Sequence, residues 1–297
     1  MGITGIGEDT FSALLGGQAG EVPLRAQLLM RFFLAFLCAV GVARLASAQQ
    51  VVQRDYRSYF EAHDVAGSFL VLDATANRYT AYNLPRCRQG FLPASTFKIP
   101  NTLIGLETGV LRDTSDLCHW DGLVRGRAEW NQDMTYAQAL RRSCVPCYQQ
   151  LARRLGVAQY QQWLPRLRFG HPMVNPATLA NFWLTGTSRI TSFEEVAFLQ
   201  RLQANRLPLS VRSQELTKGL LVVKRGPGWV LRAKGGWSEA PGYNNGWWVG
   251  WVEQAGRAYF FALNMEPRAH RPAGADFARN RQLIAEQILR EKFQLLP

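Results

Sequence analysis

The chain has 297 residues, of which 47% are hydrophobic and 19% charged, a composition typical of a globular protein with a sizeable core and not of a disordered chain. Its formal net charge is +12, but the basic residues are mostly scattered arginines, without the basic runs or interleaved aromatic residues of a nucleic-acid module. We therefore expect no nucleic-acid partner, and a basic surface that can steer an anionic substrate.

The stretch 30–48, MRFFLAFLCAVGVARLASA, has the pattern of a secretory signal peptide. A positively charged start, an apolar run too short to cross a bilayer and a small-residue cleavage site follow one another. We expect residues 1–48 to be removed after Ala48, with Met30 as an alternative start of the chain. Residues 49–297 would then be one periplasmic catalytic domain without membrane attachment. A membrane anchor or a buried helix is the alternative.

Two patterns of cysteines remain in this mature chain. Export permits disulfides. Cys87 and Cys118 could form one or remain two free thiols, and the sequence does not favour either alternative. Cys144 and Cys147 have the C-x-x-C spacing of metal or redox sites. No second pair stands at ligand spacing, however, and Pro146 lies between the two. We interpret them as buried small side chains and expect no metal.

The predicted elements begin with a β-hairpin over residues 67–83, where apolar and polar residues alternate around a turn at 74–77. An apolar-periodic helix over 101–109 ends at Gly109. The region from about 110 to 217 is expected to be mostly helical, with apolar residues at helical spacing in 134–144, 157–167 and 192–203.

The C-terminal part changes character. Aromatic and β-branched residues predict antiparallel strands over 229–237, 245–254 and 256–265, and a helix over about 275–291 closes the chain. We interpret Trp247, Trp248 and Trp251 as structural strand residues. Strands at both ends and helices in the middle predict an α+β fold, in which the N- and C-terminal segments share one antiparallel sheet flanked by helices.

The stretch PASTFKIPN (93–101) carries the strongest chemical signal. A helical turn starting at Ser95 places Lys98, three residues on, on the same face. A serine nucleophile needs a base. Burial among Phe97 and Ile99 lowers the lysine pKa, so that a neutral amine can take the serine proton. A Ser-His-Asp site is weakly supported, because the chain has no G-x-S-x-G motif and no histidine in a recognisable triad motif.

Two further motifs accompany this pair. Ser143-Cys144-Val145 lies in a helix-to-loop region, and Lys234-Gly235-Gly236 begins a predicted β-region. A second serine and lysine with a glycine-rich strand complete the signature set of the penicillin-recognising serine enzymes. PASTFKIPN, the S-x-V, NFWLTG (181–186), LRAKGGW and GWWVGWVE together resemble the class D, or oxacillinase-type, β-lactamases over nearly the whole mature chain.

The resemblance implies a secreted serine β-lactamase that hydrolyses penicillins and some cephalosporins through an acyl-enzyme, without a metal cofactor. It implies that Ser95 is the nucleophile and Lys98 the general base, the lysine carrying a carbamate made from CO2. Trp183 would donate its indole N–H to that carbamate, and Val145 and Leu184 would keep water scarce around it. Whether the enzyme forms a homodimer stays open.

The remaining implied roles concern the substrate. Ser143 would pass a proton to the leaving lactam nitrogen, and the N–H groups of Ser95 and Trp237 would form an oxyanion hole. Lys234 and Arg281 would attract the substrate carboxylate. Arg281 is preferred because RQLIAEQIL (281–289) fits the last helix of the family, and Arg279 is its competitor.

Two positions depart from the family pattern. Gly235, next to Gly236 on the substrate-binding strand, stands where the family has threonine or serine, and loss of that hydroxyl costs roughly 0.5–1.5 kcal/mol of binding. The Tyr/Phe-Gly-Asn of the family is here Phe169-Gly170-His171, which leaves the role of His171 doubtful.

Three other functions stay open from the sequence. A penicillin-binding sensor domain would stay acylated without turnover, and a D,D-peptidase would release D-alanine from cell-wall peptides. A basic surface-binding or nucleic-acid-binding protein would not be acylated at all.

Overall fold

A seven-stranded sheet forms the centre of the fold. The computed structural model describes residues 49–240, 243–268 and 276–297, and the predicted signal peptide lies outside these ranges. The strand order is β1-β3-β2-β9-β8-β7-β6, and the pairs are antiparallel apart from β1 with β3. The strands are β1 (Gln50–Gln53), β2 (Val65–Asp73), β3 (Arg78–Tyr82), β6 (Val222–Gly226), β7 (Trp229–Ala240), β8 (Tyr243–Gln254) and β9 (Arg257–Pro267), and a separate two-stranded sheet pairs β4 (Leu117–Cys118) with β5 (Met134–Thr135).

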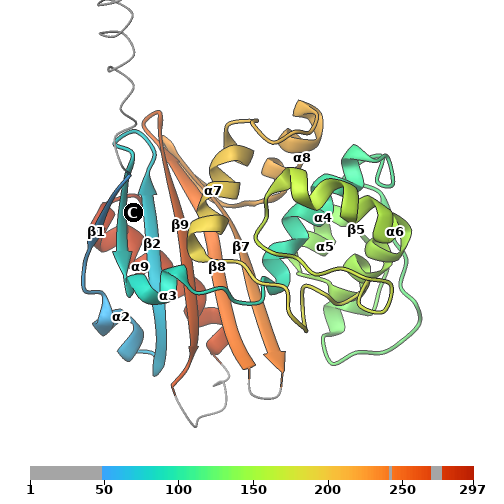
Figure 1. The fold of residues 1–297 in the computed structure, drawn as a ribbon, viewed down its shortest axis with the longest axis horizontal. Helices are drawn as coiled ribbons and strands as arrows, with labels where there is room; N and C mark the ends of the chain where they lie inside the picture. Colours follow the sequence, from blue (N-terminus) through green and yellow to red (C-terminus); the bar gives the residue numbers. More distant parts are fainter. Residues whose placement is uncertain (1–48, 241–242, 269–275) are drawn as a thin grey trace, which may run out of the picture. The chain divides into compact units, whose positions relative to one another are not determined.

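The N- and C-terminal segments share this sheet, as predicted. Strand β2 pairs with β9 along its whole length, and Figure 1 shows the cyan N-terminal hairpin beside the red and orange C-terminal strands. The hairpin turn falls at 74–77 because Asp73 Oδ1 accepts the N–H groups of Thr75 and Ala76, each at 3.0 Å. The α+β fold class is therefore confirmed.

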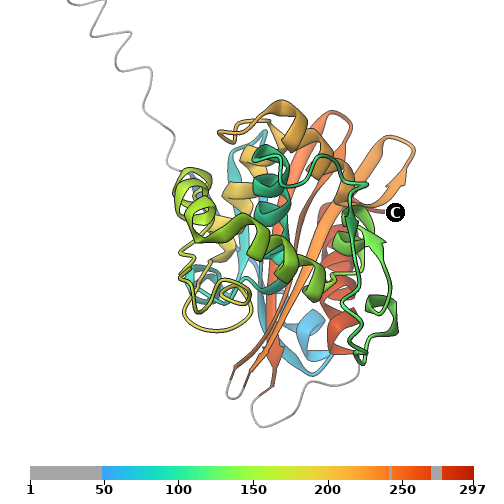
Figure 2. The same cartoon turned by 90° about the vertical axis from the view of Figure 1, so that its right-hand side faces the viewer.

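Helices cover both faces of the sheet. They are α2 (Arg57–Glu61), α3 (Leu84–Arg88), α4 (Lys98–Glu107), α5 (Tyr136–Arg141), α6 (Val145–Leu167), α7 (Ser192–Gln203), α8 (Val211–Leu220) and α9 (Phe277–Phe293), with short 3-10 turns η1 (Ala94–Phe97) and η2 (Ala128–Trp130). Figure 2 shows the red α9 and the yellow α7 on opposite sides of the strands. A hydrophobic core lies on each face of the sheet. Successive side chains of β2 point to opposite faces, so Leu70 and Leu72 pack in the core on the α7 side, whereas Phe69 and Val71 pack in the core on the α9 side.

The middle of the chain is less helical than predicted. Residues 110–133 contain only β4, η2 and irregular backbone, and residues 168–191 are turns and isolated bridges. Left-handed backbone at Arg168, Gly170 and Gly186 prevents a continuous helix in the second stretch. In the parts that the structure describes, no helix is both long and apolar enough to cross a membrane.

The two cysteine patterns have different outcomes. A Cys87–Cys118 disulfide is not formed: the Cys87 thiol faces the carbonyls of Phe69 and Tyr82, whereas the Cys118 thiol faces Gln150. Cys87 belongs to α3 and Cys118 to β4, so different elements hold the two thiols. Cys144 and Cys147 are both buried, as the sequence indicated.

A buried carboxyl supports the turn that carries Ser95. Thr96 Oγ1 lies 2.6 Å from Glu195 Oε1 on α7 and 2.8 Å from the Pro93 carbonyl oxygen. Burial raises the pKa of Glu195 to about 8, with Glu194 adding to the rise and the Thr96 hydrogen bond opposing it. At neutral pH the carboxyl is therefore protonated. The contacts of the Thr96 hydroxyl with Glu195 Oε1, to which it donates, and with the Pro93 carbonyl oxygen hold η1 against α7.

We expect the Glu195→Gln variant to change how stability depends on pH. The pKa of Glu195 is raised from 4.5 to about 8, so the unfolded chain releases a proton that the native protein keeps, and parent stability falls as pH rises through this window. The variant does not lose stability in this way. Its free energy of unfolding, relative to that of the parent, should therefore rise by on the order of 3 kcal/mol between acidic and neutral pH. Urea unfolding at several pH values measures it.

Glu107→Gln is the matched control, because hydrogen bonds from Ser210 and Ser213 lower the pKa of Glu107. The Glu107 carboxylate stabilises the fold above its ordinary pKa, and this contribution is lost as pH falls. The Glu107→Gln variant should therefore be less stable than the parent at neutral pH. Equal pH slopes for the parent and Glu195→Gln would contradict the assignment.

Candidate active site

A cleft of about 360 Å³ opens beside the start of α6, strand β7 and helix α9. The predicted site residues that line it are Ser95, Ser143, Val145, Lys234, Gly235, Trp237 and Arg281. Lys98 and Trp183 are fully buried, and Leu184, Gly236 and His171 are not among its lining residues.

The serine and the lysine of PASTFKIPN meet as the spacing predicted. Ser95 lies in η1 and Lys98 begins α4, and Lys98 Nζ is 2.6 Å from Ser95 Oγ. The lysine side chain has no exposed surface. Burial, with a smaller contribution from the positive charge of Arg127, lowers its pKa from 10.5 to about 7. At or above neutral pH the amine can therefore be uncharged and accept the Ser95 proton.

The second serine and lysine also come together, from parts of the chain far apart in sequence. Lys234 Nζ donates to Ser143 Oγ at 3.0 Å and to the Gly235 carbonyl oxygen at 2.9 Å. Ser143 has a left-handed backbone between α5 and α6, with φ +53°. Burial, with the charges of Lys98 and Arg281, holds the pKa of Lys234 well below its usual range. Because Ser143 Oγ accepts from the lysine, its own proton is available to a group in the cleft.

Strand β7 approaches the nucleophile turn closely at Gly236. A Cβ atom there would lie 2.9 Å from the Pro93 carbonyl oxygen and 3.3 Å from the Ser95 nitrogen, closer than side chains tolerate. A glycine is thus required for β7 to lie against η1. The next residue, Trp237, is placed in the cleft wall together with Ser95.

Arg281 closes the far end of the cleft, and its competitor Arg279 is exposed. The Arg281 guanidinium donates to the Gly236 carbonyl, and burial lowers its pKa to about 10. A Cβ at Gly235 would be 3.2 and 3.3 Å from ring atoms of Trp248 and 3.7 Å from Arg281 Nη1. The missing side chain would therefore stand between this ring and the guanidinium.

Trp183 lies in the turns before α7, and not in a helix. Its ring stacks on Phe97 with centroids 5.8 Å apart and planes 11° apart. Its indole Nε1 is buried and has no hydrogen-bond partner among the residues that the structure describes. Leu184 is half-buried on the same core, and its carbonyl accepts a hydrogen bond from Ser238 Oγ at 2.7 Å. An unused buried donor therefore lies in the core beside the nucleophile turn.

His171 belongs to a different part of the molecule. Its Nε2 is 3.3 Å from Glu194 Oε1, and both residues line a second, larger cavity of about 820 Å³ bordered by α6 and α7. Neither Ser95 nor Lys234 lines that cavity. The larger hollow is therefore separate from the serine and lysine pairs.

Several cleft residues were not singled out from the sequence. Arg127, Arg141, Arg142 and Trp130 enter from the segment before α6, and the scattered arginines gave no signal for them. Trp248 packs against the core on the α9 side and also lines the cleft opposite Gly235. Five cationic side chains face one acid, Glu129, among the described lining residues, so the cleft favours an anionic ligand. No cluster of metal-ligating side chains occurs in the described ranges.

Comparisons with known proteins agree with this geometry. Residues 61–290 match the family "Penicillin binding protein transpeptidase domain". The chain is 34% identical to β-lactamase OXA-48 of Klebsiella pneumoniae, over 85% of this chain and 93% of that protein, and 35% identical to OXA-2 of Salmonella typhimurium, over 91% and 96%. The structure of the class D β-lactamase YbXI from Nostoc superposes with a TM-score of 0.76 at 37% identity, covering 80% of this chain and 98% of YbXI. The chain belongs to the class D β-lactamases, and it is a serine hydrolase of that family.

Proposed function

We propose that this enzyme opens the β-lactam ring of penicillins and some cephalosporins through an acyl-enzyme on Ser95, and so confers β-lactam resistance. The observation that carries the proposal is the 2.6 Å contact between Ser95 Oγ and the fully buried amine of Lys98, whose pKa is about 7. We also propose that residues 1–48 direct export to the periplasm. Identification of the N-terminal residue of the mature protein tests this proposal.

Acylation begins when the neutral Lys98 amine takes the Ser95 proton and Ser95 Oγ attacks the lactam carbonyl carbon. The N–H groups of Ser95 and Trp237 stabilise the oxyanion. Strand β7 approaches the Ser95 turn closely at Gly236, where a Cβ atom would lie 3.3 Å from the Ser95 nitrogen. This close approach supports an oxyanion hole formed by one N–H from the turn and one from the strand. Ser143 then gives its proton to the lactam nitrogen as the C–N bond breaks and takes a proton in turn from Lys234, whose Nζ donates to Ser143 Oγ at 3.0 Å.

The substrate carboxylate is held at the other end of the cleft. The buried Lys234 and the partly buried Arg281 are the cations there, and Arg127, Arg141 and Arg142 add positive charge at the rim. A charged group buried without a counterion is costly, so an incoming carboxylate relieves the repulsion among these cations. That relief supports recognition of an anionic β-lactam.

Lys98 also fits the carbamate that the family implies, because an uncharged amine can add CO2. The unpartnered Trp183 N–H is a buried donor of the kind that a carboxylate oxygen accepts. A carbamate there would supply a carboxylate-like acceptor of protons for both acylation and deacylation. Lys98, supported by Trp183 and the apolar Val145 and Leu184, is the residue that would hold it.

We expect Ser95→Ala to abolish acylation, because the nucleophilic oxygen is lost. Turnover of a penicillin should fall by about 10⁴-fold or more. Intact-mass spectrometry should show the parent, but not the variant, with a covalent penicillin adduct. The exposed Ser115→Ala variant is the control and should keep parent activity.

The same assay separates the alternatives. Turnover of the adduct supports a β-lactamase, whereas a persistent adduct without turnover would identify a sensor domain. Release of D-alanine from cell-wall peptides would identify a peptidase. Full activity in Ser95→Ala would refute the proposed nucleophile.

We expect kcat/KM to rise with pH through about 7 and then level off, because protonated Lys98 can neither accept a proton nor add CO2. Added bicarbonate should raise the rate. Trp183→Phe keeps the ring stacked on Phe97 but removes the N–H, so this variant should need more bicarbonate than the parent.

Trp251→Phe is the matched control, since Trp251 is also fully buried but lies in β8 and does not line the cleft. It should respond to bicarbonate as the parent does. Rates that are independent of bicarbonate in both the parent and Trp183→Phe would contradict a carbamate on Lys98.

We expect Gly235→Ser to restore a hydroxyl between Trp248 and Arg281 and to lower the KM for a penicillin by about 2- to 10-fold. Gly235→Ala fills the same space without a hydroxyl. The Trp248 ring must shift slightly in both variants, so this steric cost cancels in the comparison. Steady-state kinetics measure it, and equal KM values in the two variants would show that the hydroxyl makes no contact with substrate.

A further inference from the structure

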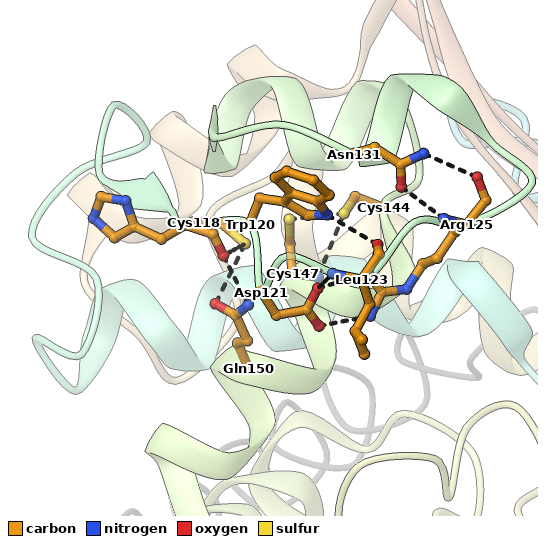
Figure 3. A network of polar contacts seen from close by, with 10 residues as sticks. Cys118, Trp120, Asp121, Leu123, Arg125, Asn131, Cys144, Cys147 and Gln150 are labelled. Carbon is orange, nitrogen blue, oxygen red and sulfur yellow. Dashed lines mark hydrogen bonds and ion pairs between the residues drawn. The ribbon is translucent and has the colours of Figure 1, made fainter.

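Three thiols gather behind the segment that carries Ser143. Cys144 and Cys147 belong to the first turn of α6, and Cys118 comes from β4. The sulfur atoms of Cys144 and Cys147 are 2.7 Å apart, and Cys118 interacts with Cys147 from the other side. Figure 3 shows the three sulfur atoms together, beside the loop that holds Trp120 and Arg125. The mechanism uses none of these thiols.

The positions of Cys144 and Cys147 favour a direct bond between them. They are three residues apart at a helix start, a spacing that places their side chains on one face. Their separation is shorter than an unbonded contact between two sulfur atoms and approaches the covalent distance of about 2.05 Å. No other cysteine has such a neighbour among the described residues, and no metal-ligating cluster includes the pair.

The electrostatics favour Cys144 as the attacking thiol. Cys144 is the N-cap of α6, and its sulfur accepts the Cys147 backbone N–H at 3.4 Å. The Cys147 thiol and N–H lower the pKa of Cys144 against the opposing effect of burial, and the positive charge of Arg125 adds to the lowering. Its neighbours Cys118 and Cys144 raise the pKa of Cys147. A thiolate at the start of a helix beside a protonated partner is the arrangement of reactive C-x-x-C pairs.

We propose that Cys144 and Cys147 are a modification site: a dithiol that a small disulfide or a thiol–disulfide oxidoreductase converts to an intramolecular disulfide. The Cys144 thiolate attacks the oxidant disulfide and forms a mixed disulfide with release of one thiol. Cys147 loses its proton and attacks the Cys144 sulfur, and the second thiol leaves. Two protons and two electrons pass from the protein to the oxidant.

The bond would brace the part of the cleft that Ser143 and Val145 form, since these residues flank Cys144 in the chain. It would replace a weak sulfur cap with a covalent link across the first turn of α6. Both thiols are nearly fully buried, so the bond forms most readily while the chain folds, in an oxidising compartment. Of the steps in this proposal, only the supply of the oxidant by an oxidising compartment rests on the proposed export.

The test uses the purified protein with oxidised glutathione as the probe. One sample is incubated in its native state, and another is unfolded and refolded in the same buffer. Remaining thiols are alkylated under denaturing conditions, and peptide mass spectrometry locates the cross-link. We expect a disulfide between Cys144 and Cys147 in at least the refolded sample, with Cys87 and Cys118 alkylated. The oxidised protein should have a Tm higher by roughly 3–6 °C, which reduction reverses.

Cys144→Ala and Cys147→Ala should each abolish both the cross-link and the redox-dependent change in Tm. Cys87→Ala removes an equally buried thiol elsewhere in the core and should keep both. Alkylation of both Cys144 and Cys147 in both samples would overturn the proposal. A Cys118–Cys147 link, or zinc bound in stoichiometric amount by the reduced protein, would overturn it too. No β-lactam is used, so the outcome is independent of the proposed hydrolysis.

Discussion

Removal of the Lys98 amine from water is the constraint on which the rest of the site depends. An ammonium group in a fully buried position is costly, and burial moves its pKa to about 7. The turn from η1 into α4 sets the neutral amine 2.6 Å from Ser95 Oγ. The aromatic residues Phe97 and Trp183 shield this pair, and the sheet holds the other wall of the cleft. A residue that is a surface cation elsewhere thus becomes a base.

The cations of the cleft reinforce one another in this role. Arg127 lowers the pKa of Lys98, of Lys234 and of Arg281. The charge that draws an anionic substrate to the site therefore also helps to keep Lys98 uncharged. Substrate recognition and activation of the nucleophile therefore share one electrostatic cause, the positive charge that Arg127 adds to the cleft.

Local patterns in the sequence were sufficient for much of the fold and of the site. Alternation predicted the hairpin and the C-terminal strands, and spacing alone paired Ser95 with Lys98. Contacts between distant segments left no such pattern. The Glu195 carboxyl meets Thr96 across the α7–η1 interface, and the register of β7 with β8 places Trp248 opposite Gly235. His171, carried over by resemblance alone, lies in another cavity because the turns after α6 direct it towards Glu194.

The charge state of Lys98 is the central claim, and an NMR titration of protein with isotope-labelled lysine side chains, in CO2-free buffer, measures it directly. The chain has only five lysines, and the signal absent from Lys98→Ala identifies the residue. We predict that this signal reports loss of a proton near pH 7, far below the ordinary lysine value of 10.5. A Lys98 signal that stays protonated well above neutral pH would contradict the account.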